Sequence, residues 1–310
     1  MDIAKEFDIM YYEYMIESVN ANREINELLM GVNFAKLVNE SCDELALYEA
    51  NVFKTVINKI KEIFDRVIKF LKELFNKITK LKVCVPKDEL VKQVENKIKK
   101  ISAKDRDSFN IKNINISKAC QSWLNEKNND KNPSTYFAVN ALIYKELDTV
   151  TDEFEKFMNG TGTSRPESDL KELLEDLNDT DGYIDQHSSL ESLKKDAEDV
   201  SFNDIKVILS LYRSGESISN DLKKNLVTVT KNMEEKQKKF IKAEDKELNV
   251  SDINYYHNII MKLTNLVVKL QKSRLSVSNI LFHNQETILR KFVTYKAEDQ
   301  VEPGTALAVR

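Results

Sequence analysis

The sequence predicts an all-α protein made of long amphipathic helices that form a bundle and end in a C-terminal antiparallel helical hairpin. Three observations favour this fold class. The 310 residues include only six glycines and four prolines, whereas a large β domain needs turn residues roughly every 8–12 positions. Apolar residues recur at intervals of three and four over long stretches, as on one face of an α-helix. The composition, 41% hydrophobic and 32% charged, is that of a mostly helical soluble protein.

Residues 1–50 are predicted to form an acidic helical segment. They carry eleven acidic and three basic residues, a net charge of −8. Helical stripes are formed by Ile9, Tyr12, Ile16, Val19, Ile25, Leu28 and Leu29 before Gly31, and by Phe34, Leu37, Val38, Leu45 and Leu47 after it. Because a strongly basic segment follows, we expect residues 1–50 to dock beside it through complementary charge.

Residues 52–83 are predicted to form one basic amphipathic helix, around which the rest of the chain is organised. Nine basic and three acidic residues give it a net charge of +6. Neither glycine nor proline interrupts it, and its apolar residues share one face. The candidate partner or membrane face consists of Phe53, Ile57, Ile60, Phe64, Val67, Leu71, Leu74, Phe75 and Ile78.

This basic helix admits three interpretations. Its apolar face can pack within a helical bundle or in self-association, which is the simplest. It can lie on an anionic membrane surface, with phenylalanines inserted and lysines toward the headgroups. It can also contact DNA phosphates, although lysine dominates over arginine and no aromatic platform accompanies it.

Residues 51–158 are predicted to form a helical module that contains the basic helix. Pro86 suits the first turn of a short lysine-rich helix at 87–104, and residues 105–115 are expected to be a connector. A third helical stretch, at 117–126, holds Trp123, which we expect in the core. The polar run 125–134 predicts a loop, after which helical periodicity resumes at 136–158.

Residues 159–200 are predicted to be an acidic, loop-rich insertion. Residues 146–205 carry eighteen acidic and five basic side chains, a net charge of −13, and short helices are expected at 168–178 and 189–199. Asp179, Asp181 and Asp185 surround Gly182 as acids do in the middle of an EF-hand loop. The positions of the terminal ligands are occupied by Leu177 and Ser188. We therefore expect an acidic turn, with a weak cation site as the alternative.

Residues 201–296 are predicted to form the long helical hairpin. One helix is expected at 202–213, and a longer charged one runs to about residue 246. The last helix is expected from an N-cap at Ser251 or Asp252 to about Lys296, with a heptad-like apolar register. Residues 297–310 have no periodicity and predict a flexible tail.

The sequence shows no catalytic constellation, metal-binding motif or glycine-rich phosphate loop, so we expect neither an enzyme nor a cofactor. His187, His257 and His283 are widely separated. Cys42, Cys84 and Cys120 lack ligand spacing and are expected to be reduced and mostly buried. The N-terminus is acidic and has no apolar core, which predicts no signal peptide. No stretch is long and apolar enough to predict a transmembrane helix.

Leu47-Tyr48-Glu49-Ala50, followed by the lysine-, isoleucine- and phenylalanine-rich helix, resembles a processing site in the precursor proteins found inside the capsids of large tailed bacteriophages. In that family a prohead protease cuts after the glutamate of a Leu/Ile-x-Glu site. The resemblance implies that Glu49 and Ala50 flank the cut and that residues 1–49 are a propeptide.

Two functional hypotheses follow. The first is a non-enzymatic structural or internal virion protein of a tailed phage that works by helix-mediated assembly, with protein partners or self-association. The alternative is a soluble helical protein, lytic or toxin-like, that binds a membrane surface through its basic amphipathic helix. The corresponding locations are the virion and the bacterial cytoplasm.

Overall fold

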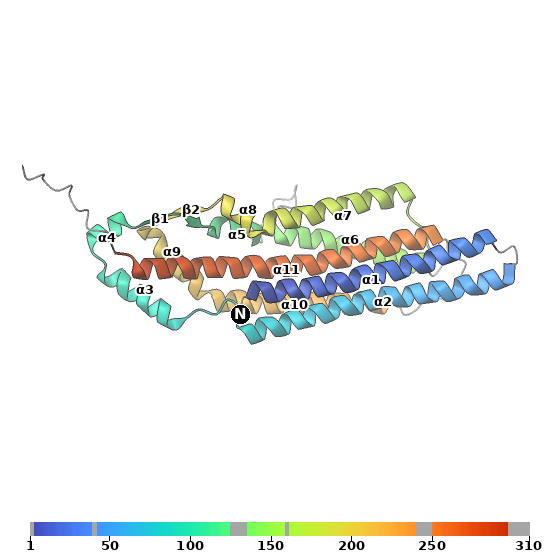
Figure 1. Ribbon diagram of the computed structural model, residues 1–310, viewed down its shortest axis with the longest axis horizontal. Helices are drawn as coiled ribbons and strands as arrows, with labels where there is room; N and C mark the ends of the chain where they lie inside the picture. Colours follow the sequence, from blue (N-terminus) through green and yellow to red (C-terminus); the bar gives the residue numbers. More distant parts are fainter. Residues whose placement is uncertain (1–2, 39–41, 125–134, 159–160, 240–249, 297–310) are drawn as a thin grey trace, which may run out of the picture.

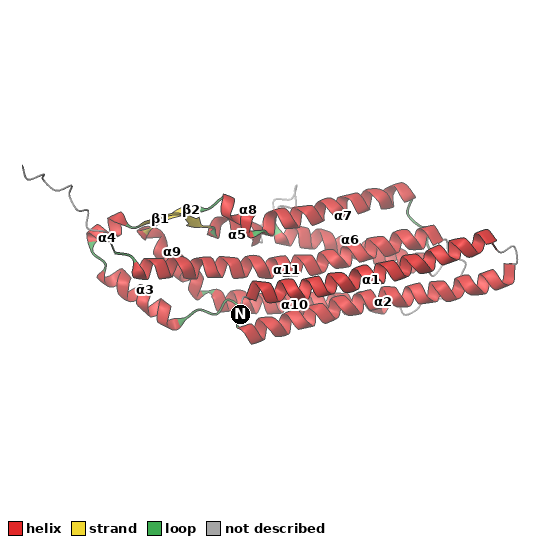
Figure 2. Ribbon diagram, in the orientation of Figure 1, coloured by secondary structure: helices red, strands yellow, loops and turns green. Residues whose placement is uncertain are grey.

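The computed structural model describes residues 3–38, 42–124, 135–158, 161–239 and 250–296. Within these residues the chain forms eleven helices and one two-stranded sheet, which confirms the all-α class (Figure 2). The molecule is an elongated bundle whose long helices run roughly along one axis (Figure 1).

Helix α11 (Val250–Thr294) is the centre of the bundle. It packs against α1 (Ile3–Val38), α2 (Cys42–Leu81), α6 (Tyr136–Met158), α7 (Glu167–Ser188) and α9 (Phe202–Arg213). Side chains are buried on every turn of α11, as expected for a helix enclosed by neighbours on several sides. The heptad-like apolar positions of this helix are all buried, but they face several helices rather than one coiled-coil partner. These positions are Tyr256, Ile260, Leu263, Val267, Leu270, Val277, Leu281 and Ile288.

Helices α1 and α2 form an antiparallel pair along one side of the bundle, and the end of α1 and the start of α2 extend past the start of α11 (Figure 1). The predicted docking of the acidic segment on the basic helix is confirmed. Lys59 binds Glu24 at 2.5 Å, Lys77 binds Glu6, and the Arg66 guanidinium donates to the Glu17 carbonyl oxygen at 2.9 Å.

A row of polar contacts joins α1 to α11. The hydroxyl groups of Tyr14 and Ser18 both donate to Asn265 Oδ1, each at 2.8 Å. His257 Nε2 lies 2.8 Å from Asn22 Oδ1, and Lys272 binds Asp8 at 2.6 Å. These contacts are called the polar ladder below.

Helix α10 (Gly215–Lys239) runs antiparallel to α11 (Figure 1), but its main packing partner is α2. Lys236 and Lys239 on α10 also bind Asp148 and Asp152 on α6. The two arms of the predicted C-terminal hairpin are antiparallel, but each arm packs mainly against other helices.

The small sheet and the short helices lie toward the end of the bundle opposite the end at which α1 stops and α2 begins (Figure 1). Strands β1 (Asn110–Asn115) and β2 (Glu198–Ser201) pair antiparallel with an irregularity in register. The remaining short helices are α3 (Asp88–Lys100), α4 (Ala103–Ser108), α5 (Ser117–Leu124) and α8 (Leu190–Lys195). A capping box of Ser201 and Asp204 starts α9.

Two sequence predictions about segment boundaries are wrong. The basic helix begins at Cys42, ten residues before the predicted start, so the proposed division at residue 50 falls inside α2. Residues 167–188 form one helix, α7, instead of a loop-rich insertion. Its Leu170, Leu177 and Ile184 are buried at intervals of seven residues, and this stripe holds α7 on α11. The predicted loop at 125–134 and tail at 297–310 lie outside the described residues.

Candidate interaction surface on helix α1

Helix α1 is apolar on two opposite sides, and the fold covers only one of them. The inner side, which packs against α2 and α11, contains Phe7, Met10, Tyr14, Ala21, Ile25, Leu29 and Val32. The exposed side contains Ile9, Tyr12, Ile16, Val19, Met30, Phe34, Leu37 and Val38, which we call the outer stripe. Successive helical residues are rotated by about 100°, which places the two sets on opposite faces.

The outer stripe is strongly exposed and narrow. Tyr12 is 65% exposed and Leu37 is 85% exposed. Its spacing from Ile9 through Val19 is that of heptad a and d positions, which form a seam against one other helix. Leu47 and Tyr48 add exposed apolar surface from α2 beside the end of the stripe.

Acidic side chains border the outer stripe on its α2 side. Glu13, Glu17, Glu24 and Glu27 are all exposed there. The carboxylate of Glu24 accepts a hydrogen bond from Lys59, which lowers its pKa, and Glu27 lies 3.6 Å from Arg23 in the middle of the stripe. Glu13 and Glu17 form no side-chain ion pair within the described part of the chain, so their charges remain available to a partner.

Sequence reasoning assigned Ile9, Tyr12, Ile16 and Val19 to the same stripe as Ile25 and Leu29. The structure separates these residues, because the first four are exposed and the last two are buried. The sequence does contain the pattern that distinguishes the buried side of α1 from the exposed side. Phe7, Met10, Tyr14 and Ala21 make a second apolar series, offset from the first by about half a helical turn.

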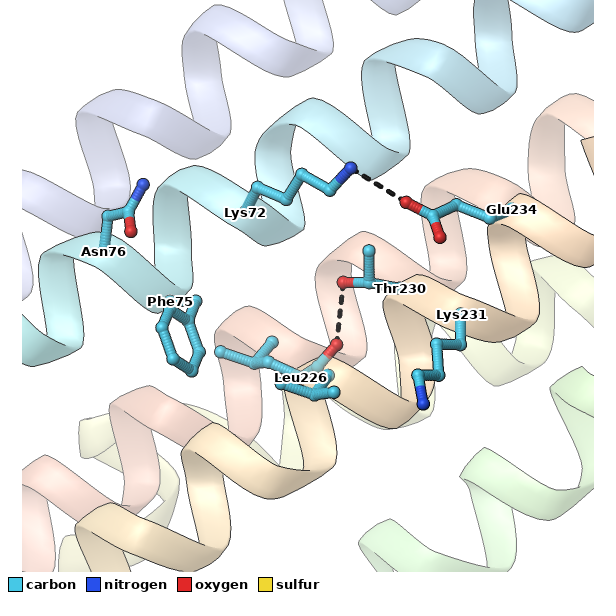
Figure 3. A pocket seen from close by; sticks show the side chains of 8 residues that line it. Lys72, Phe75, Asn76, Leu226, Thr230, Lys231 and Glu234 are labelled. Atoms are coloured by element: carbon cyan, nitrogen blue, oxygen red, sulfur yellow. Dashed lines mark hydrogen bonds and ion pairs between the residues drawn. The ribbon is translucent and has the colours of Figure 1, made fainter.

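A second surface feature is a groove between α2 and α10, which we call the α2–α10 groove (Figure 3). Its volume is about 450 Å³. It is lined by Lys72, Phe75 and Asn76 of α2 and by Leu226, Val227, Thr230, Lys231 and Glu234 of α10. The Thr230 hydroxyl donates a hydrogen bond to the Leu226 carbonyl oxygen at 2.7 Å. The hydroxyl group therefore has a hydrogen-bond partner within α10.

Lysines border the α2–α10 groove. Lys72 forms an ion pair with Glu234 at 2.8 Å across one end (Figure 3). Lys231 makes no ion pair within the described residues, and Lys69 and Lys80 are exposed on the same helix as Lys72. Val227 is 45% exposed within the groove. The groove is therefore apolar at its base, and at one edge Lys231 adds a positive charge that has no ion pair among the described residues.

The predicted partner or membrane face of the basic helix is covered by the chain itself. Seven of its residues are buried, namely Phe53, Ile60, Phe64, Val67, Leu71, Leu74 and Ile78. Ile57 and Phe75 are half-buried, and Phe75 reaches the α2–α10 groove. The bundle packing expected as the simplest interpretation is thus what the structure shows. Contact of the whole face with a membrane would require α2 to separate from α1 and α10.

Glu49 and Ala50 lie inside helix α2 rather than at a junction between segments. The Glu49 carboxylate is 3.2 Å from Lys36 Nζ on α1. A protease binds its substrate in extended form, so cleavage after Glu49 would require the first turns of α2 to unwind.

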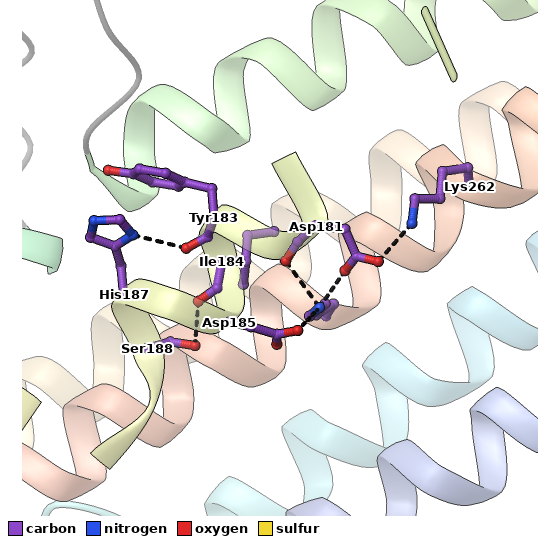
Figure 4. Close-up of polar contacts among 8 residues, drawn as sticks. Asp181, Tyr183, Ile184, Asp185, His187, Ser188 and Lys262 are labelled. Atoms are coloured by element: carbon purple, nitrogen blue, oxygen red, sulfur yellow. Dashed lines mark hydrogen bonds and ion pairs between the residues drawn. The ribbon is translucent and has the colours of Figure 1, made fainter. Parts of the chain in front are cut away.

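The predicted acidic turn around Gly182 is wrong, because Asp179, Asp181 and Asp185 all lie on helix α7. Lys262 and Lys269 of α11 bind Asp181, and Lys269 also binds Asp185 at 2.7 Å (Figure 4). Burial alone would raise the pKa of Asp181, but hydrogen bonds from the two lysines hold it below its usual range. These acids form ion pairs that attach α7 to α11, and Asp179 is exposed.

The histidines do not gather into a site. His257 is buried against α1, and burial lowers its pKa to about 4. His187 stacks on Tyr183 with ring centroids 3.9 Å apart, and its Nδ1 lies 2.9 Å from the Tyr183 carbonyl oxygen (Figure 4). No group of three or more metal-ligating side chains occurs within the described ranges.

The buried cysteines and tryptophan agree with the sequence predictions. Cys84 and Cys120 are free and buried, and burial raises the pKa of each thiol to about 12. Trp123 is buried beside Tyr183 and His187. All three side chains belong to the packed core.

Comparison with known proteins gives no relative. No family model matches the sequence, and neither a curated protein nor a solved structure matches it. Among the described helices, none combines the length and the apolar character needed to cross a bilayer.

Proposed function

We propose that this chain is a non-enzymatic structural protein that works by helix-mediated assembly, with the outer stripe of α1 as its contact surface. The observation that carries the proposal is the second apolar face of α1. A helix that is apolar on two sides is normally covered on both, and this chain covers only the inner one.

The dimensions of the outer stripe suit a protein contact. From Ile9 to Leu37 it is roughly 42 Å long at about 1.5 Å per residue. Arg23 and Glu27 interrupt its apolar surface between Val19 and Met30. With a width of about 10 Å the two apolar parts together cover on the order of 300 Å², the lower end of the range for the largest apolar patch on a typical monomer, which is often functional. Flanking polar residues would enlarge it toward the approximately 800 Å² that each partner contributes to a standard interface.

The membrane hypothesis receives less support from the same surfaces. The basic helix turns its apolar face into the bundle. The outer stripe is bordered by Glu13, Glu17, Glu24 and Glu27, whereas an interfacial helix carries lysine and arginine beside its apolar face. Anionic headgroups would repel this edge.

The setting of a phage particle rests on the resemblance at Leu47 to Ala50 alone. It is tested by the intact mass and N-terminal sequence of the protein from its native particle. A chain that begins at Ala50 supports processing and would leave the faces of α2 and α11 that α1 covers without their present partner. A chain that begins at Met1 removes the propeptide hypothesis and keeps α1 in the assembly.

Sedimentation velocity of the full chain, from about 1 to 100 µM, tests the proposed function. We expect species heavier than the 35.9 kDa monomer, and Ile16→Glu should shift them to the monomer because it places a charge in the stripe. Val207→Glu is the matched control, since Val207 is exposed on α9 outside both surfaces.

Flotation with vesicles of phosphatidylcholine and phosphatidylglycerol supplies the second measurement. We expect the chain to stay at the bottom of the gradient with unbound protein and not to rise with the vesicles. Monomer at every concentration, or vesicle binding that Ile16→Glu abolishes, would overturn it.

A further inference from the structure

We infer that the outer stripe of α1 binds the α2–α10 groove of a second copy of this chain, so that copies join head to tail. The inference rests on the proposed function and names the partner of the same surface. It is carried by two features that the isolated chain leaves unused, one convex and one concave, whose chemistry is complementary.

The apolar parts of the two surfaces match. The first part of the stripe presents four large side chains in a row, Ile9, Tyr12, Ile16 and Val19. The groove has a volume of about 450 Å³ over Phe75, Leu226 and Val227. An amphipathic helix that lays its apolar face into a groove between two helices is a common mode of recognition.

The charges beside these surfaces are opposite. The outer stripe is bordered by exposed glutamates, of which Glu13 and Glu17 have no side-chain ion pair among the described residues. The groove has Lys231 at its edge without an ion pair among the described residues, and the exposed Lys69 lies on α2 three residues before Lys72. Such complementarity steers association and selects the partner.

A chain cannot fill its own groove with its own stripe. Helices α1 and α10 both pack on α2, and the polar ladder holds the inner side of α1 against α11. The stripe therefore points away from the bundle. A contact between two different surfaces leaves one free stripe and one free groove at the ends of each assembly, which allows further copies to add.

Pairing of two outer stripes is less favourable. In an antiparallel pair related by a two-fold axis the same edge of each helix meets, so the acidic edge that carries Glu13, Glu17 and Glu24 in one copy would face the same acidic edge of the other. In a parallel pair Arg23 would stand opposite Arg23. Either pairing would also leave the groove empty.

A mixing experiment with full-length variants tests the inference. Ile16→Glu disables the stripe and leaves the groove intact, whereas Val227→Glu places an acid in the groove and leaves the stripe intact. Each variant alone should have a dissociation constant at least about 30-fold higher than that of the wild-type chain and should sediment as a monomer. An equimolar mixture should form a dimer and nothing larger. The two variants together have one functional stripe and one functional groove, and a single contact uses both.

Circular dichroism shows whether each variant is folded, and Val207→Glu shows the effect of an added charge outside both surfaces. Both test positions are exposed, so we expect native helix content. If Val227→Glu assembles like the wild-type chain while Ile16→Glu is monomeric, the stripe contacts something other than the groove. That result overturns the inference and leaves the proposed function standing. A wild-type chain that stays monomeric overturns both.

Discussion

Replacement of Gly182 by alanine should stabilise the protein, and the sign of the effect discriminates between two structures for residues 179–185. In an EF-hand-like turn the glycine permits a backbone that alanine adopts only with strain, so the substitution would destabilise. In the structure Gly182 lies inside helix α7 and is exposed, and an added Cβ would meet no atom within 4 Å. Glycine in a helix interior costs about 0.5–1 kcal/mol relative to alanine.

Urea denaturation followed by circular dichroism measures the effect of Gly182→Ala. We expect a higher midpoint with an unchanged slope, and a melting temperature raised by about 1–3 °C for a chain of this size. A lowered midpoint would refute the helical assignment of residues 179–185.

Gly215→Ala is the matched control with the opposite expectation. At this position, the first of α10, an added Cβ would collide with the Cys84 carbonyl oxygen and would lie 2.6 Å from Phe282 Cε2. Overpacking of this kind costs about 1–3 kcal/mol, so Gly215→Ala should lower the midpoint although it also replaces a helical glycine.

The remaining predictions concern the core, the pH dependence, the thiols and the proposed processing site. Leu71→Ala should cost about 2–5 kcal/mol in urea denaturation, because Leu71 is fully buried. His257 is neutral in the folded protein and has a pKa of about 4 there, so the unfolded chain binds more protons as the pH falls below about 6.5 and stability declines. Between pH 7 and pH 5 this loss should be about 2 kcal/mol, and it should be absent in His257→Gln, whereas an equal loss in both proteins would contradict the assignment. Cys84 and Cys120 should react with a thiol reagent only at the rate of unfolding, since their raised pKa values leave little thiolate, and peptide mapping after labelling measures this. A glutamate-specific protease should spare the bond after Glu49 in the native protein and cut it in urea, because this bond lies in a helix.

Helix positions were predicted well where an apolar stripe ends together with a capping or turn signal. The expected helices at 136–158 and 202–213 have the bounds that the structure shows, and the last helix ends within two residues of its predicted limit. In these segments the local pattern and the tertiary packing favour the same helix, so its bounds can be predicted from the sequence alone.

The sequence prediction was wrong where tertiary packing overrides the local signal. Gly182 among three aspartates is typical of a turn, but Lys262 and Lys269 neutralise two of these acids in a helix. Those lysines lie more than eighty residues further along the chain than the aspartates they bind, so no local sequence pattern predicts the ion pairs. The groove could not be foreseen either, because it exists only where α2 and α10 lie side by side.

The polar ladder between α1 and α11 also governs the order in which the chain can fold during synthesis. The contact between Asn22 and His257 joins residues 235 positions apart, and that between Tyr14 and Asn265 spans 251. At about 5–20 residues per second a ribosome needs roughly 10–50 s to make the intervening chain. Throughout that interval α1 has α2 as a neighbour but lacks α11, so part of its inner apolar side stays open to chaperones and to other nascent chains.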